Sequence, residues 1–84
     1  MASVSLTLSA RQEFDELPIA IRGRVAKVLE RLENWPNVSG AKPLRAGLAG
    51  RYRMRTGDYR VQFSPTGDAV TVEKIGHRDG FDDD

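Results

Sequence analysis

The segment from Arg51 to Phe63 constrains the fold most, because apolar and charged residues alternate through it on both sides of a Gly-Asp pair. A period of two places successive side chains on opposite faces of a strand, and Gly57 suits the first position of a type II′ hairpin turn. Closing the hairpin there gives one apolar face and one basic face, which is typical of an antiparallel sheet with its core on one side. The expected pairs are Thr56–Tyr59, Arg55–Arg60, Met54–Val61, Arg53–Gln62 and Tyr52–Phe63.

The residues before the hairpin predict a strand followed by two helices. Residues 4–8 alternate in hydropathy, and Ser9 offers an N-cap oxygen for a short helix that Pro18 ends. A second helix is expected from about Ile19 to Asn34, because its apolar residues recur at helical spacing. These residues are Ile21, Val25, Val28, Leu29, Leu32 and Trp35.

The remaining segments complete an α+β pattern. Residues 37–50 contain Pro43 and three glycines and predict an ordered loop, with Leu44 and Leu48 as anchors on the core. Residues 69–75 predict a last strand with Val70 and Val72 facing inward. The order strand, helix, helix and three strands predicts an antiparallel meander packed on two helices. A chain of 84 residues forms one compact domain, which we assign to residues 1–78, followed by an acidic tail at 79–84.

The charge of the chain is unevenly distributed. The formal net charge is +1, but all 13 Lys and Arg residues precede position 79, whereas four of the 12 acids follow position 78. Residues 1–78 therefore carry 13 basic residues against eight acids, a formal charge of +5. A basic body indicates a polyanionic partner. The tail is either solvated, as short acidic ends usually are, or mimics a phosphate backbone and partly occupies the basic face in the free protein.

Composition also excludes several kinds of site. Without cysteine the chain has no disulfide, thiol nucleophile or thiolate metal site. The single histidine, His77, and the absence of paired carboxylates at ligand spacing give no metal site, and a chain this short leaves little room for a cofactor pocket. No apolar run approaches the roughly 20 residues of a membrane span. We therefore expect a cytoplasmic protein without metal, cofactor or membrane partner.

The basic face of the hairpin is the candidate for chemistry. Arg55 opposite Arg60 costs about 0.2–1 kcal/mol through like-charge repulsion, and Arg53 beside them increases it. One interpretation is a solvated face whose arginines spread apart. The other is a site for an RNA or DNA backbone, because guanidinium groups bind phosphodiesters bidentately.

A longer pattern resembles a known family. The segment Leu48-Ala-Gly-Arg-Tyr-Arg-Met-Arg-Thr-Gly-Asp-Tyr-Arg-Val61 is followed by Val72 and Ile75-Gly-His-Arg78. Together with Leu44, Ser9-Ala10 and the Leu17-Pro18 break, it resembles the RelE/ParE toxin superfamily from Val4 to Arg78. The resemblance implies a cytoplasmic toxin of a type II toxin–antitoxin system, held by a cognate antitoxin. It further implies an endoribonuclease that enters the ribosomal A site and cuts mRNA without metal, by attack of the ribose 2′-OH on its own 3′ phosphate.

The resemblance also implies roles for individual residues. Arg53, Arg55, Arg60 and Arg78 match family positions that orient the phosphate and stabilise its charge. Arginine stays protonated and is a poor general base, so proton transfer is expected from His77, from water or from ribosomal RNA. His77 is the candidate within the chain; alternatively it makes a structural hydrogen bond at the strand end. We expect further RNA contacts from the following residues: Lys42, Arg45, Arg51, Gln62 and Phe81.

One departure from the family keeps other functions open. Family nucleases commonly place a tyrosine several residues after the last-strand arginine, whereas this chain has Phe81, which can stack on a base but cannot exchange a proton. The missing tyrosine favours a ParE-like poison of DNA gyrase, whereas the retained arginines favour the nuclease. A third hypothesis is a degenerate toxin that acts as a binding module, for instance a DNA-binding co-repressor with its antitoxin.

Overall fold

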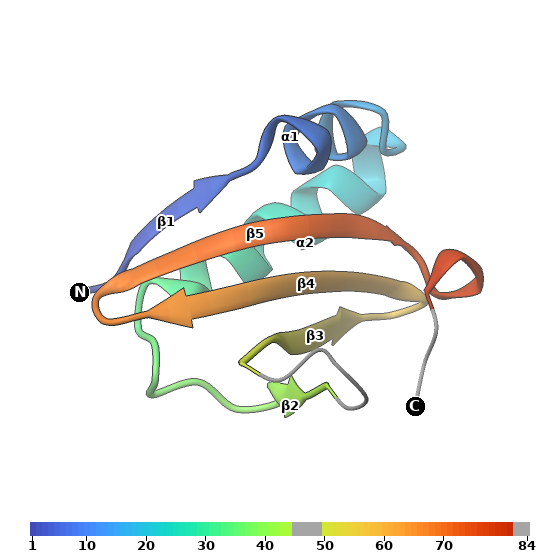
Figure 1. Cartoon of the computed structure of the whole chain (residues 1–84). Coiled ribbons are helices and arrows are strands. Elements are labelled where there is room, and N and C mark those ends of the chain that lie inside the picture. The colour runs from blue at the N-terminus through green and yellow to red at the C-terminus, as the bar shows by residue number, and fades with distance from the viewer. Residues whose placement is uncertain (45–49, 82–84) are drawn as a thin grey trace.

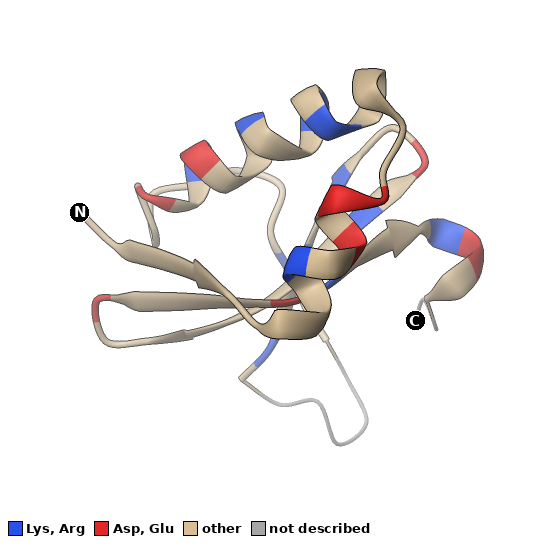
Figure 2. Ribbon diagram, turned by 90° about the horizontal axis from the view of Figure 1, so that it is seen from above, with Lys and Arg blue, Asp and Glu red and all other residues tan. Residues whose placement is uncertain are grey.

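The computed structural model describes residues 1–44 and 50–81, which form a five-stranded sheet of order β1-β5-β4-β3-β2. Both helices cover one face of the sheet and leave the other open (Figures 1 and 2). The predicted α+β fold is confirmed, with one strand more than expected. The elements are β1 (Ser3–Leu6), α1 (Leu8–Asp15), α2 (Ile19–Leu32), β2 (Lys42–Pro43), β3 (Tyr52–Thr56), β4 (Tyr59–Thr66), β5 (Ala69–His77) and a 3₁₀ turn, η1 (Arg78–Gly80).

The two helices begin and end close to the predicted positions. The N-cap of α1 is Thr7, whose Oγ1 accepts the backbone N–H of Ala10 at 3.1 Å, so the prediction of Ser9 as the cap was wrong. The helix starts at Leu8 because the hydroxyl of Thr7 accepts a hydrogen bond from a free N–H group of the first turn, which is the role that was expected of Ser9. The break before Pro18 is confirmed, and α2 ends at Leu32, two residues before the predicted end. Neither helix in the described ranges is long and apolar enough to cross a bilayer.

The core lies between α2 and the sheet. Its central side chain, Phe63, is fully buried, and the ring of Trp35 packs edge-on against it at 5.3 Å and against Tyr52 at 4.9 Å. Each such large apolar side chain contributes about 1.5–3 kcal/mol by leaving water. The other apolar residues with 3% or less of their surface exposed are Ala10, Val25, Val28, Leu32, Met54, Val61, Val70, Val72 and Ile75.

The hairpin between β3 and β4 has the predicted register. All five predicted pairs are present, from Thr56 opposite Tyr59 to Tyr52 opposite Phe63. Gly57 has a φ of +61°, in the left-handed region that a side chain would disfavour. The turn and the alternation therefore agree, and the basic residues of the hairpin share the sheet face away from the helices.

A β-bulge interrupts the pairing between β4 and β5. Gln62 lies opposite Lys74, but the next residue, Phe63, lies opposite Val72. Glu73 is therefore an extra residue in β5 that has no counterpart on β4. A bulge of one residue reverses which side chains face the core, because strand side chains alternate with a period of two.

This reversal decides where the end of β5 directs its side chains. Strict alternation from Val72 would place Lys74 toward the helices and His77 on the open face. Instead Ile75 is buried, with 2% of its surface exposed, and Lys74 lies on the open face. His77 is opposite Tyr59, on the side of the helices.

Candidate nucleic-acid interface

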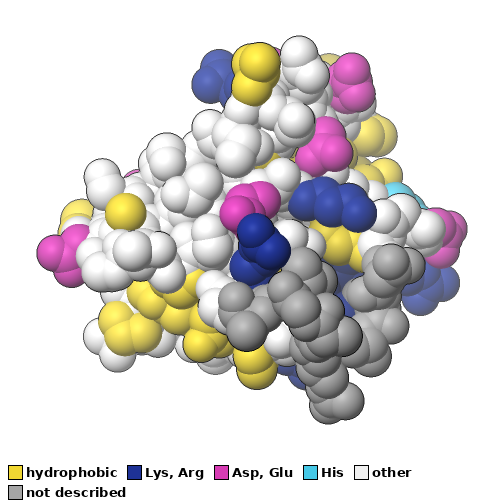
Figure 3. Space-filling model, viewed as in Figure 1, with side chains coloured by type: hydrophobic (Ala, Val, Ile, Leu, Met, Phe, Trp, Pro, Cys, Tyr) yellow, Lys and Arg dark blue, Asp and Glu magenta, His cyan; other side chains and the backbone are white. Residues whose placement is uncertain are grey.

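The open face of the sheet carries a cluster of cationic side chains, which we call the arginine face. The pairing of β3 with β4 and of β4 with β5 fixes its members, since directly opposite residues share a face. Figure 3 looks onto this side, where Lys and Arg side chains lie near the centre of the view. The arginine face comprises Arg53 and Arg55 from β3, Arg60 and Gln62 from β4, and Lys74 and Gly76 from β5.

Two of its arginines are buried rather than solvated. Arg53 and Arg60 have 6% and 5% of their surface exposed, whereas Arg55 is exposed. The alternative of a fully solvated basic face was therefore wrong for these two residues. Arg60 folds back over the hairpin turn, where Nη1 donates to the carbonyl oxygens of Gly57 at 3.3 Å and Tyr59 at 3.4 Å. These carbonyl dipoles offset part of the repulsion from Arg55.

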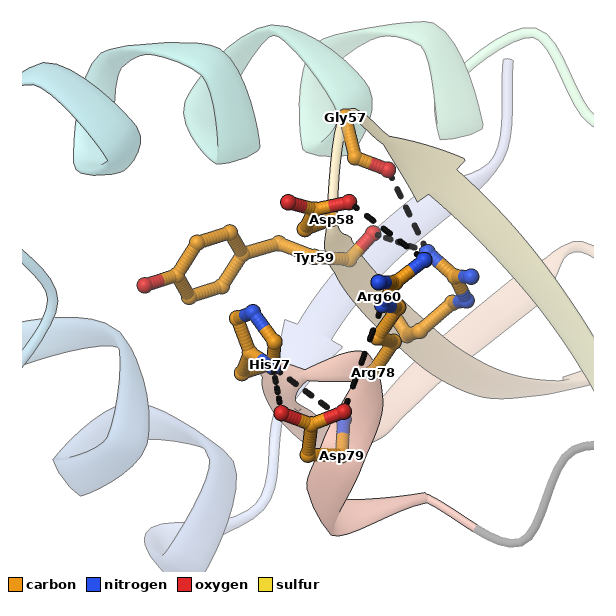
Figure 4. Close-up of polar contacts among 7 residues, drawn as sticks. All are labelled: Gly57, Asp58, Tyr59, Arg60, His77, Arg78 and Asp79. Carbon is orange, nitrogen blue, oxygen red and sulfur yellow. Dashed lines mark hydrogen bonds and ion pairs between the residues drawn. The ribbon is translucent and has the colours of Figure 1, made fainter.

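Arg78 lies at the end of the sheet beside the same turn. Its backbone N–H donates to the Asp58 carbonyl at 2.7 Å, and its guanidinium is 3.8 Å from Asp58 Oδ1 and 4.0 Å from Asp79 Oδ1. These ion pairs are long and exposed, so they hold Arg78 only weakly. Figure 4 draws Arg60 and Arg78 on one side of the sheet and the rings of Tyr59 and His77 on the other.

The structure places the His77 ring on the opposite face of the sheet from Arg53, Arg55 and Arg60, although His77 and Arg78 both contact the Asp79 carboxylate. The His77 ring contacts Tyr59 edge-on at 5.4 Å, on the side of the helices. Its Nδ1 accepts the backbone N–H of Asp79 at 3.1 Å and lies 3.2 Å from Asp79 Oδ2. This contact caps the turn η1. The geometry matches the structural alternative for His77, a hydrogen bond at the end of the strand.

Phe81 and Lys74 add an aromatic element to the arginine face. The Lys74 ammonium lies 4.3 Å from the centroid of the Phe81 ring and donates to the Gly80 carbonyl at 2.7 Å. The ring lies over Gly76, where an added Cβ would be 3.5 Å from Phe81 Cε1. Since Gly76 is opposite Arg60, the ring lies on the same face as that arginine. The sequence did not single out Lys74, because the bulge that turns it toward this face has no local signal.

The other expected RNA contacts occupy different environments. Arg51 Nε is 3.0 Å from Glu73 Oε1, so a carboxylate already neutralises its charge, and Ser64 Oγ donates to Glu73 Oε2 at 3.3 Å. Lys42 is exposed opposite Arg53 at the edge of the sheet, and Gln62 is half-buried between β3 and β5. Outside the described residues lie Arg45, the expected anchor Leu48, and the tail residues Asp82, Asp83 and Asp84.

The arrangement is suited to binding phosphate. Within residues 1–44 and 50–81, no three His, Asp or Glu side chains gather in a way that could hold a metal ion. Cationic side chains from three strands share one face, and an aromatic ring lies beside them. Guanidinium groups bind phosphate oxygens bidentately, and an aromatic ring can stack on a base.

Comparison with known proteins identifies solved structures with the same fold. No family model and no curated protein matches the sequence. A chain of the RelBE2 toxin–antitoxin complex from Mycobacterium tuberculosis superimposes with a TM-score of 0.80 and 28% identity, over 92% of this chain and 98% of that one. The isolated RelE toxin of E. coli superimposes with a TM-score of 0.77 and 17% identity, over 92% and 84% of the two chains. The RelB-RelE complex of Methanococcus jannaschii gives 0.74 and 23%, over 88% and 89%. The chain therefore has the fold of the RelE toxins.

Proposed function

We propose that this protein is the toxin of a type II toxin–antitoxin system and that it cleaves mRNA in the ribosomal A site. Several structural neighbours are complexes of a toxin with its antitoxin, which supports a cognate antitoxin as partner. The observation that supports the nuclease proposal is the arginine face, where Arg53, Arg55 and Arg60 lie together on the side of the sheet that the helices leave open.

The chemistry follows from what cations can do for a phosphodiester. The ribose 2′-OH attacks the adjacent phosphorus, a new O–P bond forms, and the bond to the 5′ oxygen of the next nucleotide breaks. One proton leaves the 2′-OH and one joins the departing 5′ oxygen, giving a 2′,3′-cyclic phosphate and a 5′-hydroxyl. The arginines bind the nonbridging oxygens, whose negative charge increases in the transition state. DNA is not a substrate, because it lacks the 2′-OH.

Proton transfer is the step that has the least support from the side chains of the arginine face. His77 lies on the other side of the sheet, and the Phe81 ring has no exchangeable proton. Glu73, a carboxylate near the face, is held by Arg51 and Ser64. We therefore assign proton transfer to water or to groups of the ribosome, which gives a chemical reason for the reaction to require the ribosome.

The exposure of the arginine side chains predicts the order in which they contact the RNA. Arg55 and Arg78 are exposed and can meet a phosphate directly, whereas Arg60 is 5% exposed. Contact between the phosphate and Arg60 thus requires the residues that cover its side chain to move. We expect RNA to bind through the exposed arginines first and to engage Arg60 afterwards.

The test combines translating ribosomes, a defined mRNA and the purified protein. Wild-type protein should cut the mRNA within the A-site codon, and Arg60→Ala should lose the cut. Lys27→Ala is a matched control, because Lys27 is an exposed cation on α2 outside the arginine face. Intact mRNA at high concentrations of wild-type protein would contradict the proposal.

A ParE-like gyrase poison is the second candidate. The phenylalanine at position 81 and the placement of the His77 ring on the other face of the sheet favour it, since both remove proton-transfer groups from the arginine face. Growth arrest after expression separates the two functions. Arg60→Ala should abolish arrest by a nuclease and leave arrest by a gyrase poison largely intact.

A further inference from the structure

A second basic site lies at the outer edge of β3. A hollow of about 500 Å³ opens between the end of α2, the segment 39–42 and β3. This volume lies within the range of about 300–1,000 Å³ that is common for ligand sites. Of the eight described residues that line it, none is acidic and four are cationic. The cationic residues are Arg31, Lys42, Arg53 and Arg55.

Arg31 is held in a fixed position in this hollow. Its Nη2 donates to the Ser39 carbonyl at 2.7 Å and lies 3.5 Å from Ser39 Oγ. This contact ties the segment 39–41 to the last turn of α2. A guanidinium has five N–H donors, so Arg31 keeps donors for a ligand. It therefore combines a full positive charge with a preorganised position.

Three of the four cations in the hollow have no acidic partner among the described residues. No acid in the described ranges lies within 4.0 Å of the charged groups of Arg31, Lys42 or Arg55. Like charges that line a concave surface repel one another and attract counter-ions into it. An anion in the hollow would relieve this repulsion, and the planar guanidinium groups would favour a phosphate.

Arg55 connects the hollow to the arginine face. It lines the hollow and is also directly opposite Arg60 on β4. Neighbouring strands lie about 4.7–4.9 Å apart, so a strand of RNA crossing the edge of β3 passes from one group of cations to the other. An acidic peptide could also bind arginine and lysine, but continuity with the arginine face favours RNA.

We propose that this hollow binds a backbone phosphate of the RNA, next to the phosphate held by the arginine face. The proposal rests on the proposed function, because it extends the path of the same RNA. Arg31 and Lys42 would hold a neighbouring phosphate and position the strand without reading bases, since phosphate contacts carry no sequence information. The sequence analysis expected an RNA contact from Lys42; the site around Arg31 is new.

The experiment measures binding of a labelled single-stranded RNA as a function of salt. For single strands the slope of log K against log salt is about −0.7 for each phosphate contact. Arg31→Gln and Lys42→Gln should each reduce the steepness by up to about 0.7 and weaken binding severalfold at low salt. Lys27→Gln, on the same helix as Arg31 but outside the hollow, should leave both quantities unchanged.

Three results would overturn the inference. The first is wild-type affinity and slope in both variants while Arg55→Gln changes them. The second is that wild-type protein does not bind the RNA. The third is that the two variants weaken binding of a labelled aspartate-rich peptide and not of RNA, which would make the hollow a protein site. Arg31→Gln also removes the hydrogen bond that anchors Ser39, which would affect binding indirectly. Lys42→Gln tests the hollow while leaving that hydrogen bond in place. Failure of the ribosome assay with unchanged salt results would instead refute the proposed nuclease and leave the phosphate site standing.

Discussion

The two faces of the sheet use the same strands for opposite purposes. The helix-covered face packs Phe63, Val61 and Met54 against α2, and its side chains are held by exclusion from water. The arginine face gathers like charges that repel one another, and two of them are buried. This difference teaches that burial of apolar side chains on one face stabilises the fold, whereas the other face gathers cationic side chains, which can bind an anionic ligand. Variants of the two faces should therefore affect different measurements.

The largest effect should come from the helix-covered face. Phe63→Ala leaves a cavity beside Trp35 and Tyr52, and truncation of a buried phenylalanine costs about 3–5 kcal/mol. Urea denaturation should show this loss in the free energy of unfolding. Arg55→Ala is the matched change on the other face and should alter stability by no more than about 0.5 kcal/mol, as is usual for exposed positions. Similar losses of unfolding free energy in both variants would contradict the difference between the two faces.

The next effect should appear in catalysis. Arg60→Ala removes a cation from the position that we propose to bind the reacting phosphate, and loss of one such group typically slows a reaction about 10²- to 10³-fold. We expect this decrease in the single-turnover rate of cleavage on ribosomes. The free energy of unfolding should change far less than in Phe63→Ala. A cleavage rate equal to that of wild type would remove Arg60 from the site.

A smaller effect of opposite sign should follow Glu73→Gln. This change removes the carboxylate that lies 3.0 Å from Arg51 Nε, so Arg51 becomes available to a phosphate. RNA affinity should rise severalfold at low salt, and the salt dependence should steepen by up to about 0.7. Combining the change with Arg51→Gln should cancel the gain; a gain that persists in the double variant would locate its cause elsewhere.

The smallest effect should come from His77→Gln. General acid or base catalysis contributes about 10²- to 10⁴-fold, so loss of a catalytic histidine would be obvious. Because the ring lies on the side of the helices, we expect the cleavage rate to stay within about threefold of wild type. A decrease of 100-fold or more would return His77 to the catalytic group and would require the end of β5 to rearrange on the ribosome.

Local patterns predicted the parts of the fold that depend on neighbouring residues. The β3–β4 register followed from alternation around Gly57, and the extent of α2 followed from its apolar stripe. The bulge at Glu73 could not be predicted, because it is set by how β5 pairs with β4 and has no residue signature. That single extra residue explains why Lys74 was missed and why the His77 ring lies on the opposite face from Arg53, Arg55 and Arg60. Arg31 was missed because its partner, Ser39, is a contact of the folded chain.

The most direct test of the central claim is the chemistry of the cut ends, with an mRNA that carries a single 2′-deoxy nucleotide at the cleavage position. The account predicts that wild-type protein on translating ribosomes leaves a 2′,3′-cyclic phosphate and a 5′-hydroxyl on normal mRNA, and that the 2′-deoxy mRNA stays intact. Cleavage of the 2′-deoxy mRNA, or ends with a 3′-hydroxyl and a 5′-phosphate, would contradict attack by the 2′-OH at the arginine face.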